Sequence, residues 1–177
     1  MANWRQALHI EPPQGWLNDP NGLCFFHGLC HVFFQYCPTQ PDGTAPKCWG
    51  HCQSPDLLHW TFTGASLFPD TPQDQNGAYS GCAVACGDLL RLYYTGNVKH
   101  PGPYDYIRTG RESNTLMVET PDGIQMGAKQ LLLTNADYPA DCSLHVRDPK
   151  VWREEDRWYM LLGARSLQDA GRLLLYR

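Results

Sequence analysis

The segment DPNGLCFFHGLCHVFFQY, residues 19–36, decides the fold, because it places a turn between two short apolar runs. A run of this kind, broken at His-Gly and resumed in an aromatic-rich stretch, is typical of a β-hairpin. Two other segments share the layout: SGCAVACGDLLRLYYTG, residues 80–96, and DPKVWREEDRWYMLLGA, residues 148–164. Their first residues, 19, 80 and 148, recur at a long and nearly constant spacing. The sequence therefore predicts three related hairpins.

A second pair of strands is expected after each of the first two hairpins. Residues 49–64 and 116–129 both place a Ser/Thr-Pro-Asp turn between strand-like runs. Units of four short strands that recur radially are typical of a β-propeller. A sandwich of hairpins and a β-helix are the alternatives, and the long four-strand period argues against the β-helix. We therefore predict an all-β propeller.

The repeat also predicts where chemistry could gather. The innermost strand of each propeller blade lines the central funnel, so equivalent positions in successive blades converge near one axis. Asp19, Ser80 and Asp148 are those positions, which brings two carboxylates and a hydroxyl to one pocket. Pro20 and Pro149 cannot donate to a strand ladder and fit the edge strand that faces the funnel.

The residues around these acids suit a polyhydroxylated ligand. Clustered carboxylates serve metal binding, acid–base chemistry or displacement at the anomeric carbon of a sugar. Arg147 is expected to hold the pKa of the neighbouring Asp148 carboxyl down and so keep it ionised. His51 is interpreted as a packed, hydrogen-bonded histidine rather than a catalyst. Amide, aromatic and basic side chains nearby could bind sugar hydroxyls or stack on a ring: Trp16, Asn18, Gln35, Trp49, His51, Tyr79 and Arg147.

Composition argues against several other classes. The net charge is −4 without a basic run, so no nucleic-acid partner is expected. No apolar stretch is long enough to span a membrane, and the N-terminal MANWRQALHIEPP lacks a secretory signal, so we expect a cytoplasmic protein. The two C-x3-C cysteine pairs, Cys48/Cys52 and Cys82/Cys86, suggest zinc. Four residues along a strand span roughly 13 Å, too far for two sulfurs to share an ion. We predict reduced thiols, no metal and no cofactor.

Several motifs together resemble glycoside hydrolase family 32, most closely its bacterial sucrose-6-phosphate hydrolases and invertase-like β-fructofuranosidases. The resemblance runs from about His9 to Arg177. It rests on WLNDPNG (16–22), WGHCQSPDLLHW (49–60), GAYSGCAV (77–84), LYYTGN (92–97) and VRDPKVW (146–152).

The resemblance implies a five-bladed propeller with a retaining site for terminal β-fructofuranosides such as sucrose or sucrose 6-phosphate. Asp19 would be the nucleophile that forms a fructosyl-enzyme intermediate, and Asp148 would stabilise the transition state. The two catalytic carboxyls of a retaining site lie roughly 5–5.5 Å apart. The fructose pocket would be shaped by Trp16, Leu17, Asn18, Gln35, Trp49, Tyr79, Ser80 and Arg147.

The sequence departs from the family pattern in several places, of which two bear on the site. The acid/base Glu-Cys motif of the family lies beyond the second Asp motif, and the only later glutamates, Glu154 and Glu155, fall in a hairpin turn. We therefore expect residues 1–177 to be the N-terminal part of one propeller domain, about two and a half blades of five. Such a chain should hydrolyse little sucrose alone and self-associate through its open edge. Gly43 stands where the family often has tryptophan, which weakens Trp49 as a ligand.

Three alternatives to a fructoside hydrolase stay open on the residues alone. A fructosyltransferase shares the first half-reaction, and nothing in the sequence separates the two. A non-catalytic sugar-binding propeller would need no acid/base residue. A protein-interaction propeller of the WD type should repeat every 40–45 residues, whereas the spacing here is longer.

Overall fold

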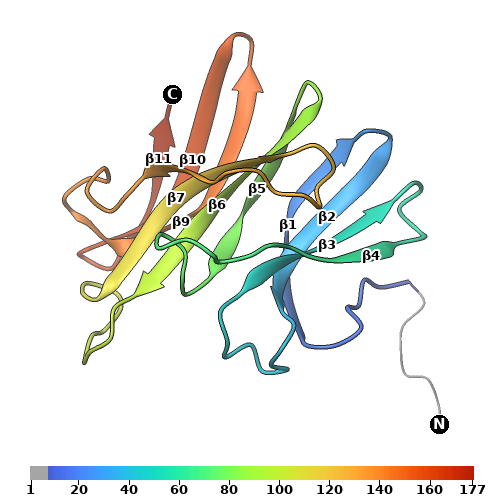
Figure 1. Cartoon of the computed structure of the whole chain (residues 1–177). Coiled ribbons are helices and arrows are strands. Elements are labelled where there is room, and N and C mark those ends of the chain that lie inside the picture. The colour runs from blue at the N-terminus through green and yellow to red at the C-terminus, as the bar shows by residue number, and fades with distance from the viewer. Residues whose placement is uncertain (1–7) are drawn as a thin grey trace.

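The computed structural model describes residues 8–177 as an all-β arrangement (Figure 1). Residues 1–7, which begin the stretch used to argue against a secretory signal, lie outside the described residues. From residue 8 onward, no helix has the length and apolar character needed to cross a membrane.

Eleven strands form three antiparallel sheets in the described part of the chain. The order is β1-β2-β3-β4 in the first sheet, β5-β6-β7-β8 in the second and β9-β10-β11 in the third. The strands are β1 (Trp16–Phe26), β2 (Leu29–Cys37), β3 (Cys48–Ser54), β4 (Thr61–Leu67), β5 (Ala78–Cys86), β6 (Leu89–Lys99), β7 (Arg111–Thr120), β8 (Gln130–Leu133), β9 (Cys142–Glu154), β10 (Arg157–Ser166) and β11 (Gly171–Tyr176).

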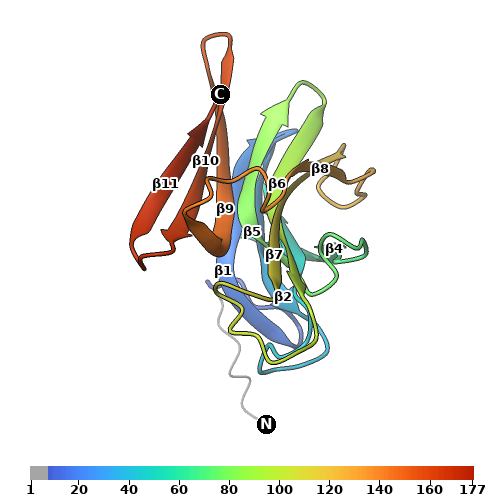
Figure 2. The same cartoon turned by 90° about the vertical axis from the view of Figure 1, so that its left-hand side faces the viewer.

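The three sheets are consecutive propeller blades. Within each sheet every strand pairs with its neighbour in sequence, and the edge strands β1, β5 and β9 come together where the sheets meet (Figure 2). This confirms the all-β propeller prediction and the edge positions of Pro20 and Pro149. The third sheet has three strands among residues 8–177, one fewer than each of the first two sheets.

The predicted hairpins are confirmed, but one strand was misplaced. The segment 116–129 does not hold two strands, since β7 ends at Thr120 and β8 begins only at Gln130. The Thr120 hydroxyl accepts the Gly123 amide at 2.9 Å, and the Asp122 carboxylate accepts the Ile124 and Gln125 amides at 2.8 Å. These side-chain acceptors stabilise a wide turn instead of a strand, which delays the fourth strand.

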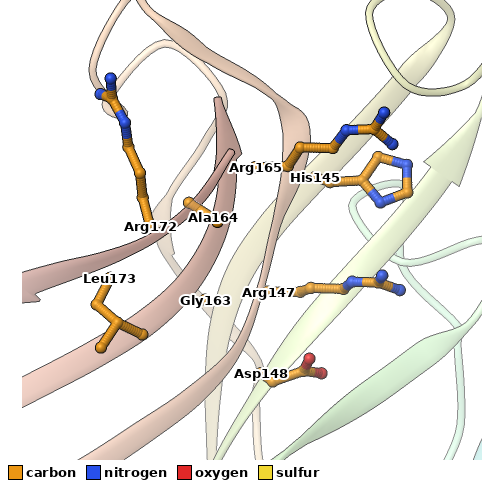
Figure 3. A pocket seen from close by; sticks show the side chains of 9 residues that line it. His145, Arg147, Asp148, Gly163, Ala164, Arg165, Arg172 and Leu173 are labelled. Atoms are coloured by element: carbon orange, nitrogen blue, oxygen red, sulfur yellow. The ribbon is translucent and has the colours of Figure 1, made fainter. Parts of the chain in front are cut away.

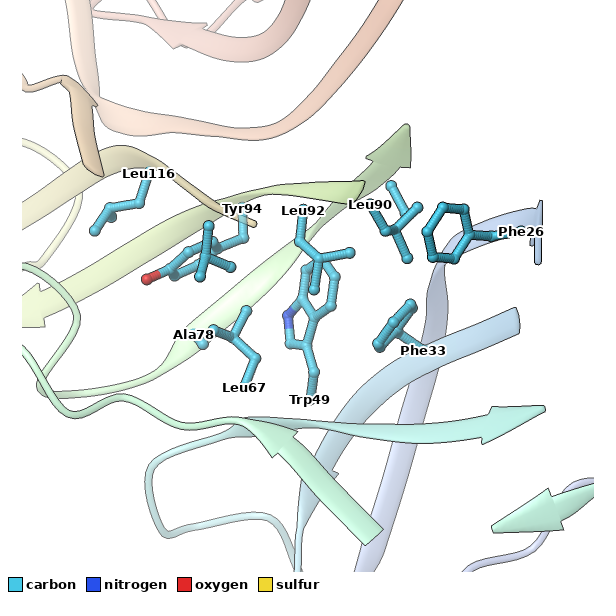
Figure 4. Packing of buried hydrophobic residues seen from close by; sticks show 11 residues of the cluster. Phe26, Phe33, Trp49, Leu67, Ala78, Leu90, Leu92, Tyr94 and Leu116 are labelled. Atoms are coloured by element: carbon cyan, nitrogen blue, oxygen red, sulfur yellow. The ribbon is translucent and has the colours of Figure 1, made fainter. Parts of the chain in front are cut away.

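Aromatic and aliphatic side chains from both sheets fill the space between the first two blades (Figure 4). Trp49 of β3 and Tyr94 of β6 are fully buried there, and their rings meet edge to face with centroids 6.2 Å apart. Burying side chains of this size contributes about 2–3 kcal/mol each. The cluster comprises Phe26, Phe33, Trp49, Leu67, Ala78, Ala83, Leu90, Leu92, Tyr94, Leu116 and Val118.

A chain of hydrogen bonds through two buried histidines runs across the first sheet. His31 Nε2 lies 3.2 Å from the Phe26 carbonyl oxygen, which can only accept. In the neutral pair, His31 Nδ1 must then accept from His51 Nε2 at 2.9 Å, and His51 Nδ1 must accept from the Thr63 hydroxyl at 2.7 Å. The interpretation of His51 as a packed histidine is confirmed, because it has no exposed surface.

A buried ion pair holds the loop between β4 and β5. Lys129 Nζ lies 2.6 Å from the carboxylate of fully buried Asp74, which also accepts the Tyr94 hydroxyl at 2.8 Å. The same ammonium group reaches Asp70 at 2.5 Å. The loop that leads into β5 is thereby attached to the second sheet.

Candidate active site

All three predicted polar positions lie where the register of an inner strand is interrupted. In β1 the pairing with β2 jumps between Leu17 and Pro20, which leaves Asn18 and Asp19 outside the regular ladder. In β5 the jump between Tyr79 and Gly81 leaves out Ser80. The β9–β10 ladder is likewise irregular beside Asp148, between the Lys150 and Arg147 pairs. Bulges of this kind re-aim side chains and are common beside active sites.

The bulges aim these side chains into one pocket of about 590 Å³ between the three inner strands. Eight of the ten predicted site residues line it: Trp16, Asn18, Asp19, Gln35, Tyr79, Ser80, Arg147 and Asp148. The convergence of two carboxylates and a hydroxyl, expected from the 61- and 68-residue spacing of positions 19, 80 and 148, is therefore present in the structure.

Two neighbours orient the carboxylate of Asp19. The Ser80 hydroxyl donates to Oδ2 in a short hydrogen bond that joins the first and second blades. Asn18 Nδ2 donates to Oδ1 at 3.1 Å. Each carboxylate oxygen thus has one protein donor, and Asp19 itself is exposed to the pocket. The fixed, accessible group is suited to attack an electrophilic carbon.

Asp148 is held in an unusual backbone conformation. Its φ of 60° lies in the left-handed region, which costs a residue other than glycine about 1–2 kcal/mol. Its amide donates to the hydroxyl of buried Thr95, on β6, at 3.0 Å. The second blade therefore helps to keep the Asp148 carboxyl on the pocket side.

The prediction that Arg147 holds the pKa of the Asp148 carboxyl below its ordinary value was wrong. Arg147 does act to lower the pKa of the carboxyl, but burial is the larger effect and raises it above its ordinary value, with a further rise from the negative charge of Asp19. Part of Asp148 faces open solvent, yet the surrounding protein removes enough water from its carboxyl group for burial to dominate. No ion pair joins Arg147 to Asp148 among residues 8–177.

Leu17 and Trp49 do not line the pocket. Trp49 has no exposed surface, and its indole nitrogen donates to the Tyr79 carbonyl at 3.0 Å. The prediction of Trp49 as a pocket residue is thus corrected: its ring packs in the core and positions the strand that carries Ser80. Leu17 is partly exposed on β1, at the edge of the bulge that turns Asp19 inward.

A hydrogen bond to the backbone fixes the orientation of the Gln35 side-chain amide. Its amide nitrogen donates to the Ala78 carbonyl at 2.8 Å, and the side chain is nearly buried. The Gln35 carbonyl oxygen is then the part of the amide available to a hydroxyl of a bound molecule.

Lys47 and Asn21 also line the pocket, and no clear sequence signal pointed to either of them. Lys47 lies 5.5 Å from the centre of the Trp16 ring and donates to the Gly43 carbonyl. Asn21 is buried, and both polar atoms of its amide lack a partner. Gly43 packs against the Trp16 ring, where a Cβ would come within 2.7 Å of Cδ2. The turn-rich sequence around Gly43 could have suggested that the backbone there lies close to another group, but it could not have identified that group as the Trp16 ring.

The pocket therefore combines paired carboxylates with amides, a hydroxyl, two cations and two aromatic rings. Such a lining can bind several sugar hydroxyls and place a carboxylate beside the reacting carbon. Within residues 8–177 no three His, Cys, Asp or Glu side chains are grouped to hold a metal ion.

The chain is similar to known proteins in sequence and in fold. The profile of the Glycosyl hydrolases family 32 N-terminal domain matches residues 9–177. A sucrose-6-phosphate hydrolase from Klebsiella pneumoniae is 46% identical over 95% of this chain and 34% of its own length. A raffinose invertase from Escherichia coli is 39% identical over 98% of this chain and 35% of its own. The chain thus spans about a third of the length of the curated relatives it matches.

Solved structures agree with the sequence relatives. A sucrose-6-phosphate hydrolase from Lactobacillus gasseri has a TM-score of 0.85 at 32% identity, covering 98% of this chain and 34% of the other. A mutant β-fructofuranosidase from Bombyx mori, solved in complex with sucrose, has a TM-score of 0.80 at 34% identity, covering 98% and 35%.

Proposed function

The chain belongs to glycosyl hydrolase family 32, and on that premise we propose that its pocket is the fructosyl-binding half of a retaining β-fructofuranosidase site. The observation that carries this proposal is the placement of Asp19, Ser80 and Asp148, from three separate blades, in one pocket.

Asp19 is proposed as the nucleophile. Its carboxylate attacks the anomeric carbon of the fructosyl ring, the bond to the departing sugar oxygen breaks, and that oxygen leaves with the bonding electrons and takes up a proton. Ser80 and Asn18 support this role because they fix the carboxylate without blocking the pocket. Water then attacks the fructosyl ester, which restores the carboxylate and releases fructose.

Asp148 is proposed to bind fructose hydroxyls and to stabilise the positive charge that develops on the ring. Only the ionised carboxylate of Asp148 can perform this role. Because the pKa of this carboxyl is raised, it takes up a proton at a higher pH than an ordinary aspartate, so activity should fall in acid. Gln35, Tyr79, Trp16 and Arg147 complete the proposed sugar contacts, in keeping with their positions in the lining.

The substrate is proposed to be sucrose or a phosphorylated sucrose, because a relative is named a sucrose-6-phosphate hydrolase and the Bombyx mori complex contains sucrose. Hydrolysis and transfer to a second sugar share the first half-reaction, and the present residues serve either. We also propose that the 177-residue chain alone turns over little sucrose, since Glu154 and Glu155 flank the β9–β10 turn and no glutamate lines the pocket among residues 8–177. The cytoplasmic location and the absence of a nucleic-acid partner stay predictions.

Sugar binding tests the proposal directly. Isothermal titration of the purified chain with sucrose should show binding that maltose, which lacks fructose, does not reproduce. Asp148→Asn should weaken the sucrose affinity at least about tenfold, because it removes a charged hydrogen-bond acceptor. Asp156→Asn changes an exposed carboxylate in the β9–β10 turn and should have no effect. Equal binding of both sugars, or an unchanged affinity in Asp148→Asn, would contradict the proposed site.

A further inference from the structure

The direction of the Asp148 side chain decides whether the sugar pocket has its second carboxylate. Asp148 lies on the boundary between this pocket and a second one, of about 630 Å³, on β9, β10 and β11 (Figure 3). Neighbouring residues of a regular strand point to opposite faces of the sheet. Figure 3 instead shows Arg147 and Asp148 projecting to the same side of β9. The backbone at Asp148 therefore breaks the alternation, in keeping with its φ of 60°.

A residue outside the pocket supports this backbone conformation. Thr95, on β6, is not among the residues that line the sugar pocket and is only 1% exposed. Its hydroxyl accepts a hydrogen bond from the Asp148 amide at 3.0 Å. The left-handed region is unfavourable for residues other than glycine and persists only where the surrounding structure favours it. The Thr95 hydroxyl supplies such a contact at the strained residue itself.

A second contact fixes β9 as a whole against the second blade. The Cys82 thiol, on β5, accepts a hydrogen bond from the Val151 amide at 3.1 Å. Cys82 and Val151 also belong to one buried apolar cluster. Because this contact lies three residues beyond Asp148, it secures the position of the strand. The conformation of Asp148 within the strand is then left to its own hydrogen bond with Thr95.

Thr95 also lies beside the residue that orients the other carboxylate. In the ladder between β5 and β6, Thr95 pairs with Tyr79, and the register jump directly after this pair leaves out Ser80. The Ser80 hydroxyl in turn donates to Asp19. The strand segment that carries Thr95 is thus adjacent to the supports of both acids.

We propose that Thr95 is a positioning residue for the reaction, because its hydroxyl keeps Asp148 in the left-handed conformation and so keeps the carboxylate in the sugar pocket. The inference rests on the proposed function for the role of Asp148. Valine has nearly the shape of threonine but cannot accept a hydrogen bond. In Thr95→Val the Asp148 amide loses its acceptor, the backbone relaxes toward an ordinary strand conformation, and the carboxylate turns away from the sugar.

Amide hydrogen exchange in the whole 177-residue chain tests the hydrogen bond without any sugar. The Asp148 amide should exchange at least about tenfold faster in Thr95→Val than in the wild type, because its acceptor is lost. Thr95→Ser keeps a hydroxyl at the same position and should retain most of the protection. Circular dichroism checks that both variants are folded.

Titration with sucrose measures the effect on the site. Thr95→Val should weaken the sucrose affinity at least about fivefold, whereas Thr95→Ser should stay within about twofold of the wild type. Thr115→Val is the matched control. Thr115 is also 1% exposed and pairs with Thr95 from the next strand, β7, but its hydroxyl lies 3.0 Å from the Tyr138 hydroxyl. This control should bind sucrose within about twofold of the wild type.

A double variant separates positioning from a general loss of packing. Asp148→Asn already lacks the carboxylate that Thr95 is proposed to orient. Adding Thr95→Val to Asp148→Asn should therefore weaken sucrose binding by no more than about twofold further. A packing role that is independent of Asp148 would instead multiply the two losses.

The outcomes are distinct. Sucrose binding that is unchanged in Thr95→Val, or equally weakened in Thr115→Val, would overturn the positioning role and leave the proposed function standing. Losses that multiply in the double variant, or unchanged exchange of the Asp148 amide, would also refute that role. Faster exchange of this amide in Thr95→Val, in a chain that binds no sucrose, would support the support of Asp148 by Thr95 and contradict the proposed function.

Discussion

Replacing His51 with glutamine should make the stability of the chain much less sensitive to acid. Burial lowers the pKa of His51 to about 4, and the nearby His31 adds to this effect. An unfolded histidine binds its proton below about pH 6.5. Between these values the unfolded state holds the extra proton, so the free energy of unfolding falls as the pH is lowered through the window.

The size of the effect follows from the shift. Each pKa unit corresponds to 1.36 kcal/mol, so the difference between about 6.5 and about 4 gives His51 a loss of about 3 kcal/mol across the window. The pKa of His31 is also lowered by burial, so it adds to the loss in the same sense. Carboxylates that accept backbone amides in exposed turns act at lower pH. Backbone amides lower the pKa of the exposed Asp105 to about 2, so the contribution of Asp105 to stability is lost only below about pH 4.

Urea denaturation followed by tryptophan fluorescence, at constant salt and between about pH 4.5 and 7.5, measures the slope. His51→Gln keeps a hydrogen-bonding side chain but cannot titrate, so its curve should be flatter than the wild-type curve. His59→Gln is the control, because the pKa of this exposed histidine is raised by Asp56 and its effect has the opposite sign. If the stability of His51→Gln depended on pH as steeply as that of the wild type, the assignment of a neutral His51 in the hydrogen-bonded chain across the first sheet would be wrong.

Two other substitutions test the packing that supports the site. Asp74→Asn should destabilise the chain by about 3 kcal/mol in urea, because Lys129 would lose its buried partner, and a loss below about 1 kcal/mol would show the pair to be unimportant. Gly43→Ala should weaken sucrose binding severalfold by displacing the Trp16 ring, whereas Gly28→Ala carries similar backbone strain at φ 80° with no neighbour within 4 Å and should bind normally. Equal sugar affinity in the two glycine variants would remove Trp16 from the site.

The repeat of hairpins predicted the convergence of the acids because equivalent strand positions must meet around a propeller axis. The spacing of Asp19, Ser80 and Asp148 was enough to place them in one pocket. It was not enough to show how they point, which depends on the bulges in β1, β5 and β9. A register shift of this kind leaves no clear pattern in a turn-rich sequence, so the left-handed backbone of Asp148 could not be predicted either.

Trp49 and Arg147 show two further limits of sequence reasoning. A tryptophan beside a glycine and a histidine has the same sequence pattern whether its ring faces a sugar or the core, and here the core encloses it. For Arg147, the direction of its effect on Asp148 could be predicted from charge alone. The larger opposing effect of burial depends on atoms from all three blades and required the structure.

The most direct test of the central claim is to trap the fructosyl group on Asp19. β-D-Fructofuranosyl fluoride has a leaving group that departs without protonation, so the chain needs only its nucleophile and sugar pocket to react. Mass spectrometry of the treated chain should show the addition of one fructosyl group, located on the peptide that contains Asp19 and absent from Asp19→Asn. An unmodified folded chain, or an adduct that persists in Asp19→Asn, would contradict the account.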